Sequence, residues 1–288
     1  MSFRRLTTIF AIALCVCVTS CDVPIDRFGS NTVMLATLTH RGMEIADAQA
    51  ADLAAVMDEQ FGTPDQPRLP DGLPSQVHTL LDLDELERCG GNVSSDKSDI
   101  HHGMFREHCV SCHGINGNGA GPTASVQFPY PRNFRMGIFK WKSTRRASMP
   151  TIDDIAGTLR RGIAGTAMPT FALQAPEDRQ ALAQYVVFLS IRGQTERQCM
   201  QLLADEPADS VEEIKSLVQE TAAEITQRWL DAENEVVDVP AVPDYVTDDA
   251  DTLSADLVKR HRESVTAGRK LFNGKVTGCA GCHGVDAA

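Results

Sequence analysis

Two copies of one pentapeptide constrain this chain of 288 residues more than any other feature. Cys109–His113, of sequence CVSCH, and Cys279–His283, of sequence CAGCH, both have the pattern Cys-x-x-Cys-His. Two cysteines three positions apart lie on the same face of a helix, so both thiols can bond to one rigid group. The histidine that follows directly then lies beside that group and has a ring nitrogen with which to bind a metal. Each copy therefore predicts a short helix built against a bulky cofactor.

The pattern is the attachment signature of c-type haem, in which both thiols add to vinyl groups and the histidine binds the iron. A thioredoxin-like redox pair and half of a zinc site are the alternatives for Cys-x-x-Cys alone. A zinc site would need two more ligands nearby, and a redox pair does not need the histidine. We therefore predict two covalent haem c groups, attached at Cys109, Cys112, Cys279 and Cys282, with His113 and His283 as axial iron ligands.

A low-spin electron carrier also needs a ligand on the other side of the iron. Met168 is our candidate, because Pro169 forces it into an extended conformation and so holds its thioether on a stiff loop. Gly162 and Gly165 allow that loop to approach a porphyrin closely. A methionine opposite a histidine raises the potential of the haem. Met149 also precedes a proline and remains the alternative ligand.

The first 21 residues are expected to direct export rather than to fold. Arg4 and Arg5 precede an apolar run, Leu6–Val18, that is too short to span a bilayer comfortably. The small residues before Cys21 resemble a bacterial lipobox, in which the cysteine is acylated. We therefore expect an extracytoplasmic protein, on the periplasmic side, that is anchored to a bacterial membrane by lipid on Cys21. An ordinary secretory signal is the alternative.

The formal charge of −12 argues against nucleic acid as a partner, because phosphate binding requires a basic surface. The expected partners are redox proteins or a respiratory complex, and the membrane is expected to be reached through the lipid anchor.

The segment from Ser98 to Arg192 resembles a class I cytochrome c domain. Phe105 lies four residues before the first cysteine, and Met168 has the family's Ala-Met-Pro context. Asp178–Leu189 resembles the C-terminal helix, which in this family crosses the N-terminal one. The resemblance implies an all-α fold around the haem and a role in electron transfer. His101 departs from the family, which usually has a glycine there, and we expect Gly103 to serve instead.

The resemblance also bears on the two remaining cysteines, Cys89 and Cys199, which flank this domain. Crossing helices would bring the two ends of the domain together, and disulfides persist in exported proteins. A Cys89–Cys199 disulfide is therefore one hypothesis, and two separate buried thiols are the other.

The second unit begins in a similar way, because Gly268–Phe272 resembles the family's N-terminal helix. The chain stops five residues after His283, so this domain is expected to continue beyond the given sequence. The predicted organisation is a signal peptide at 1–21, a helical and loop leader at 22–95, a first cytochrome c domain at 96–192, a helical and acidic linker at 193–262, and the N-terminal part of a second cytochrome c domain at 263–288.

Electron transfer by a carrier or by a subunit of a respiratory complex fits all of these features. The alternative is an enzyme of the di-haem cytochrome c peroxidase type, in which one haem iron has an open position for peroxide.

Overall fold

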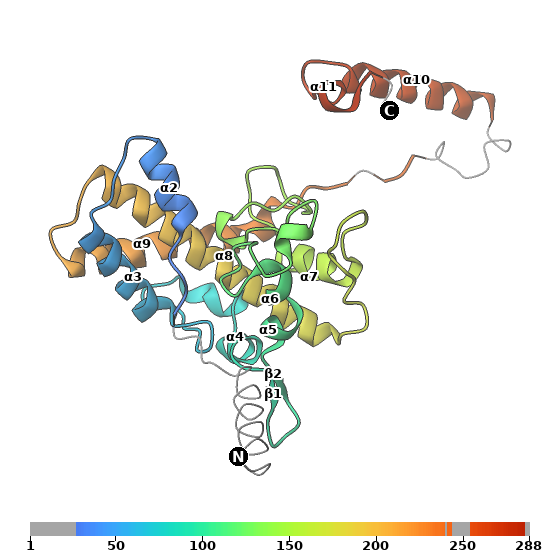
Figure 1. Ribbon diagram of the computed structural model, residues 1–288. Helices are drawn as coiled ribbons and strands as arrows, with labels where there is room; N and C mark the ends of the chain where they lie inside the picture. Colours follow the sequence, from blue (N-terminus) through green and yellow to red (C-terminus); the bar gives the residue numbers. More distant parts are fainter. Residues whose placement is uncertain (1–26, 240, 244–253, 286–288) are drawn as a thin grey trace, which may run out of the picture. The chain divides into compact units, whose positions relative to one another are not determined.

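A computed structural model describes residues 27–239, 241–243 and 254–285 of the chain (Figure 1). The chain divides into two compact units after Val237. The predicted signal peptide and the predicted lipid attachment at Cys21 lie outside the described residues. Among the residues that are described, no helix has the length and apolar character needed to cross a membrane.

Helices are the main regular structure of the first unit, which has only two short strands, and this confirms the predicted all-α class. Its α-helices are α2 (Thr32–His40), α3 (Asp47–Phe61), α4 (Leu83–Cys89), α5 (Met104–His108), α6 (Val110–His113), α7 (Ile152–Arg161), α8 (Pro176–Asp205) and α9 (Val211–Leu230). Short 3-10 helices are η1 (Ser75–Thr79), η2 (Ala124–Val126), η3 (Phe134–Met136) and η4 (Asp231–Glu235). The strands β1 (Ser94–Ser95) and β2 (His101–His102) pair antiparallel, with Ser94 opposite His102.

The long helix α8 is the centre of the first unit. It begins with Pro176, which is well tolerated at the first position of a helix, and Glu177 and Asp178 favour the positive end of the helix dipole. Helices α2, α3, α4, α5, α7 and α9 all contact α8. In Figure 1, α3 and α9 lie on one side of α8 and α5, α6 and α7 on the other. A helix covered on several sides buries almost its whole circumference, and every residue from 181 to 196 except Gln184 is buried.

Residues 193–262 were predicted to form a linker between two domains. Helix α9 lies within this range but belongs to the first unit. The Ser210 hydroxyl caps this helix by accepting a hydrogen bond from the Glu213 amide at 3.2 Å. The buried face, which includes Ile214, Val218 and Ile225, packs against α3 and α8. Such an apolar face needs a covering surface, and these two helices provide it. The boundary between units therefore lies after Val237 and not after residue 192.

The predicted leader is also part of the same core. Helix α3 lies within this leader, and its last residue, Phe61, contacts Phe188 of α8 with ring centroids 6.1 Å apart. Phe28 packs on the other edge of Phe188 at 6.3 Å. Residues 27–95 therefore share a hydrophobic core with the predicted cytochrome domain.

The first helix of that domain is shorter than a class I domain led us to expect, because residues 94–102 form a β-hairpin and α5 begins only at Met104. Gly103 precedes α5 with φ of 76°, a conformation that favours glycine. A Cβ at Gly103 would collide with the backbone of Asn92. Gly103 therefore permits a close approach to residue 92, and not the approach to the C-terminal helix that was predicted.

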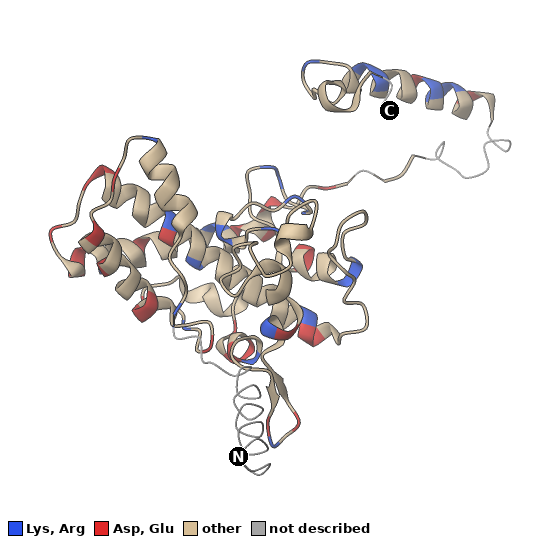
Figure 2. Ribbon diagram, in the orientation of Figure 1, with Lys and Arg blue, Asp and Glu red and all other residues tan. Residues whose placement is uncertain are grey.

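The second unit contains α10 (Ala255–Phe272) and α11 (Ala280–His283). No residue of either helix is buried. Figure 2 shows that α10 carries mostly basic charges, whereas acidic side chains are frequent on α3 and α9. The segment 254–285 contains six lysines and arginines, which are Lys259, Arg260, Arg262, Arg269, Lys270 and Lys275. Its acidic residues are Asp256 and Glu263.

Candidate haem-binding site

An apolar cavity of about 300 Å³ lies in the first unit, and it is lined by the first Cys-x-x-Cys-His motif. This volume is within the range of pockets that hold small ligands and cofactors. The other walls come from α7, α8 and two loops, and they include Phe134, Phe139, Ile155, Leu159, Ile163, Phe171 and Val186. The cavity therefore combines mostly apolar walls with a small number of reactive side chains.

His113 is the last residue of α6 and is buried, with 8% of its surface exposed. Its Nδ1–H donates a hydrogen bond to the Arg132 carbonyl oxygen at 3.0 Å. Burial lowers the pKa of His113, although the same hydrogen bond acts in the opposite direction. The imidazole is therefore neutral at neutral pH, which is the form that binds metals, and Nε2 is the nitrogen left for an iron.

The two cysteines of the motif differ in their surroundings. Cys109 is buried, and burial raises the pKa of its thiol to about 12. Cys112 is partly exposed, and burial alone would raise its pKa. A hydrogen bond that Gln127 donates to Cys112 Sγ at 3.0 Å, together with a hydrogen bond between Cys112 Sγ and Thr123 Oγ1 at 3.4 Å, outweighs burial and lowers that pKa. Both thiols line the cavity, so both can reach one flat cofactor within it.

Met168 lines the same cavity, although it is 55 residues from His113 in the sequence. Its loop is fastened to itself by hydrogen bonds from the Ile163 amide to the Met168 carbonyl, at 3.2 Å, and from the Met168 amide to Thr166 Oγ1, at 3.1 Å. Gly162 has φ of 66°, and a Cβ there would lie 2.8 Å from the Pro169 carbonyl oxygen. Gly162 is therefore required by its close approach to Pro169, and the approach of this loop to a porphyrin stays a prediction.

The alternative ligand Met149 has a different place in the fold. It packs against the hydrophobic core and is not one of the cavity-lining residues. Its carbonyl oxygen accepts a hydrogen bond from Thr144 Oγ1 at 2.7 Å. Of the two methionines that precede a proline, the structure places only Met168 together with His113.

These residues fit a covalent haem. Two thiols, a neutral imidazole with its Nδ1 occupied and a thioether all line one apolar cavity. Arg132 and Lys140 also line it and are suited to pair with the carboxylates of a porphyrin. Sequence reasoning missed these two cations. The Pro-Arg-Asn-Phe segment that contains Arg132 resembles a loop of bacterial cytochrome c domains and could have pointed to that residue.

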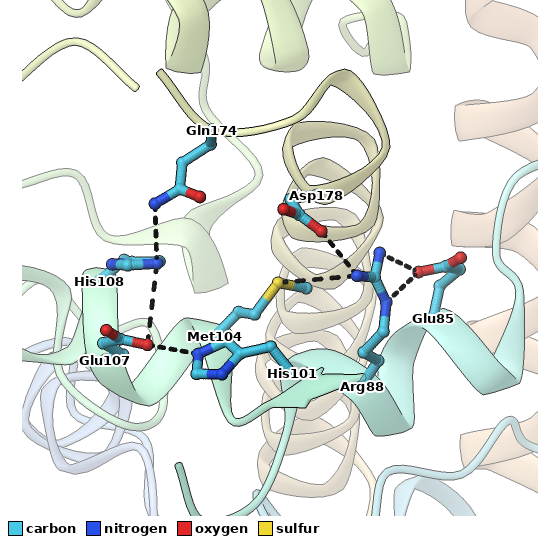
Figure 3. A network of polar contacts seen from close by, with 8 residues as sticks. All are labelled: Glu85, Arg88, His101, Met104, Glu107, His108, Gln174 and Asp178. Atoms are coloured by element: carbon cyan, nitrogen blue, oxygen red, sulfur yellow. Dashed lines mark hydrogen bonds and ion pairs between the residues drawn. The ribbon is translucent and has the colours of Figure 1, made fainter. Parts of the chain in front are cut away.

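A polar network holds the start of the motif against α8 (Figure 3). Arg88 of α4 pairs with Asp178 of α8 at 2.6 Å, and it also pairs with Glu85. His108 also lines the cavity, and its Nε2 is 3.2 Å from the side-chain nitrogen Nε2 of Gln174. Gln174 lies just before the start of α8. These contacts fix α4 and α5 on the first turns of α8, and α5 leads directly into Cys109.

The second motif occupies a more open setting. Cys279 is partly exposed, and Cys282 and His283 are exposed. Residues 238–288 contain no methionine, so a Met ligand for a second haem does not come from this segment.

The structure does not form the disulfide proposed between Cys89 and Cys199. Both cysteines are free and buried. Cys89 lies near Tyr185, whereas Cys199 Sγ approaches the Leu217 carbonyl of α9 at 3.9 Å. Because α8 continues without a break, the 14 residues from 185 to 199 carry Cys199 about 21 Å along the helix axis. Such a separation excludes a disulfide, which requires Cα atoms within about 7 Å.

A helical domain with a Cys-x-x-Cys-His motif against an apolar cavity is typical of proteins that carry electrons on a covalent haem. The sequence model of the cytochrome c family matches residues 103–190, and the helical fold of this part of the chain is consistent with a cytochrome c domain. That domain supports a haem-based role in electron transfer for the chain.

The other comparisons add little. No curated protein matches the chain. A chain of the reducing HAO-like protein complex of Kuenenia stuttgartiensis is 23% identical, with a TM-score of 0.35. The match covers 64% of this chain and 61% of that one, so this chain spans less than two thirds of the relative.

Proposed function

We propose that this chain is an exported, lipid-anchored electron carrier with two covalent haem c groups. The observation that carries the proposal is the cavity of the first unit, where Cys109, Cys112, His113 and Met168 meet from two distant parts of the sequence. When bound, a haem supplies an iron that accepts and releases one electron.

The protein residues would hold that haem in a closed, water-poor site. Cys109 and Cys112 would attach the porphyrin, while His113 and Met168 would bind the iron. The hydrogen bond from His113 to the Arg132 carbonyl would fix the imidazole tautomer and raise its basicity as a ligand. With both axial positions filled, a small substrate has no open iron position to bind, which favours electron transfer over catalysis.

The second haem and the anchor rest on the sequence. Cys279, Cys282 and His283 repeat the attachment pattern, and Cys21 follows an apolar segment of the kind that directs export. Acyl chains on Cys21 would hold the chain to the outer face of a bacterial membrane, where redox proteins or a respiratory complex are the expected partners.

A pair of methionine variants tests the first site. Expressed with a c-type maturation system, the wild-type chain should show the charge-transfer band of a methionine–iron bond. Met168→Ala should abolish this band and lower the potential of that haem, because methionine ligation raises it. Met149→Ala is the matched control and should change neither. Loss of the band in Met149→Ala but not in Met168→Ala would contradict the proposed ligand.

Carbon monoxide and peroxide separate the carrier from the peroxidase alternative. The first haem should bind neither in the wild-type protein and should bind carbon monoxide in Met168→Ala. Rapid turnover of peroxide by the wild-type protein would instead favour the enzyme.

A further inference from the structure

Helix α9 lies outside residues 103–190, which match the cytochrome c family, yet it reaches the wall of the haem cavity. Three aromatic rings connect it to the imidazole of the proposed iron ligand, His113. Phe134 stacks on His113 with ring centroids 4.5 Å apart and planes at 18°, and Phe139 lies 6.4 Å beyond it at 7°. Trp229 of α9 then meets Phe139 edge to face, at 5.7 Å and 78°. The three rings thus form a continuous contact path from the imidazole to α9.

Trp229 is held in this path by packing alone. It is 1% exposed, and its Nε1–H has no hydrogen-bond partner among the described residues. A buried indole N–H normally has such a partner, and leaving it without one costs stability. The position of Trp229 is therefore explained by contacts of its ring, including the contact with Phe139.

A second contact ties the segment after α9 to the loop that carries Phe139. The Arg145 amide donates to the Glu235 carbonyl at 3.0 Å, and the Val237 amide donates to the Ser143 carbonyl at 2.9 Å. The Arg145 and Glu235 side chains also pair at 3.6 Å. Phe139 and Trp229 are thus joined both through their rings and through the backbone that follows each of them.

The opposite side of Phe134 is fixed by α8. Gly193 of α8 faces η3, and a Cβ at Gly193 would collide with Arg135, the residue after Phe134. Arg135 is therefore in close contact with α8, which limits movement of η3 in that direction. This segment supplies both constraints on the His113 ring, namely the Arg132 carbonyl at Nδ1 and the Phe134 ring on one face.

We propose that Trp229 and Phe139 are positioning residues for the haem site. They hold Phe134 against the imidazole of His113, which fixes the orientation of that ring and keeps water from its face. Water stabilises the more highly charged ferric form, so excluding it raises the potential of the haem. The inference rests on the proposed function, because it takes His113 to be an iron ligand.

Trp229→Leu tests this inference, because it keeps an apolar side chain but removes the aromatic edge. The matched control is Val218→Ala, which also truncates a buried side chain of α9 but lies 11 residues, about 16 Å, before Trp229. The measurements are the potential of the first haem, the low-temperature EPR spectrum of the ferric protein and the midpoint of thermal unfolding.

We expect both variants to unfold at a lower temperature. Only Trp229→Leu should change the EPR spectrum, which reports the orientation of the axial ligands. It should also change the redox equilibrium constant of the first haem about threefold towards the oxidised form. At 59 mV per tenfold change, this lowers the potential by about 28 mV. Equal potentials and spectra in the two variants, matching those of the wild type, would overturn the inference.

Two further variants keep the test decisive if Trp229→Leu does not retain haem. Trp229→Phe preserves an aromatic edge and should keep the wild-type potential and spectrum. Phe139→Leu removes the next ring and should lower the potential as Trp229→Leu does, whereas an unchanged potential in Phe139→Leu would overturn the inference.

The wild type and His113→Ala separate this inference from the proposed function. If the wild-type chain carries no haem, or if His113→Ala leaves the low-spin spectrum unchanged, the proposed function itself fails. If the wild type behaves as proposed but the Trp229 and Phe139 variants match it, only the positioning role fails.

Discussion

At the scale of single residues, the haem site depends on the conformation of the loop that carries Met168, which is set by steric contacts and a few hydrogen bonds. Gly162 and Gly165 illustrate the difference between conformational strain and collision. Both have positive φ, of 66° and 75°. A Cβ at Gly162 would lie 2.8 Å from the Pro169 carbonyl, whereas a Cβ at Gly165 would meet no atom within 4 Å. The two glycines therefore form a natural pair for testing the methionine loop.

Gly162→Ala should displace the loop and Gly165→Ala should leave it in place. Both substitutions strain the backbone at a cost on the order of 1–3 kcal/mol, because Gly165 has positive φ and Gly162 combines φ of 66° with ψ of −167°, a conformation almost confined to glycine. Gly162→Ala adds the collision, so we expect a total loss of about 2–3 kcal/mol and a weaker Met168–iron band. Urea unfolding and the visible spectrum measure the two effects. A normal band in Gly162→Ala would show that the loop does not depend on this contact.

Cys89 and Cys199 give a prediction that depends on pH. Burial raises the pKa of the Cys199 thiol to about 12, and it also raises that of Cys89, from a usual value of 9.0. Above that usual value the unfolded chain loses these protons and the folded chain keeps them, so stability falls as pH rises. Each thiol contributes a slope of up to about 1.4 kcal/mol per pH unit.

The urea midpoint should therefore fall between pH 8 and pH 10, and less steeply in a Cys89→Ala, Cys199→Ala double variant. At pH 8 both thiols should resist alkylation in the native holoprotein and react fully after denaturation without reductant. Absence of reactive thiols in the denatured protein would mean that the disulfide forms after all.

Sequence reasoning worked best where the chemistry lies in a contiguous motif. The two Cys-x-x-Cys-His pentapeptides and the Ala-Met-Pro segment are local patterns, and the structure brings the first pentapeptide and Met168 to one cavity. Lys140 and Trp229 were missed because they act through contacts between distant segments, and such contacts leave no local pattern. The disulfide hypothesis failed for the same reason, since the length of α8 decides where Cys199 lies.

At the scale of elements, α8 and α9 extend the cytochrome c domain into a larger helical unit. The C-terminal helix was predicted over 178–189, but α8 runs to Asp205 because α3 and α9 provide apolar surfaces that bury its additional turns. The apolar face of α9 recurs in the sequence at helical spacing, through Ile214, Val218 and Ile225. The surface on which it packs was not, because the choice between a neighbouring helix and a separate partner depends on tertiary structure.

The stability of α9 should depend on its cap. Ser210→Ala removes the acceptor for the Glu213 amide and should destabilise the first unit by about 1 kcal/mol. Ser216→Ala is the control, because the Ser216 side chain is exposed and only bonds back to the Glu212 carbonyl of the same helix. We expect a change of less than about 0.5 kcal/mol there. Equal urea midpoints for the two variants would show that the cap does not contribute.

At the scale of the whole molecule, the two units differ in charge and in burial. The first has a shared core that includes the predicted leader, the cytochrome c domain and α9. The second repeats the attachment motif on a basic helical pair in which no residue is buried. The sequence predicted two attachment sites. The first lines an apolar cavity, whereas the second lies on helices with no buried residue. The number and position of covalent haems is therefore the central claim.

Peptide mapping of the mature protein tests this claim most directly. The chain is expressed with a c-type maturation system, extracted with acid and acetone to remove any haem that is not covalently bound, digested and analysed by mass spectrometry. We expect the peptides that contain Cys109–His113 and Cys279–His283 each to carry one porphyrin, and Cys112→Ala with Cys109→Ala to remove the first alone. Recovery of either peptide without porphyrin from the wild-type protein would contradict the claim of two covalent haems.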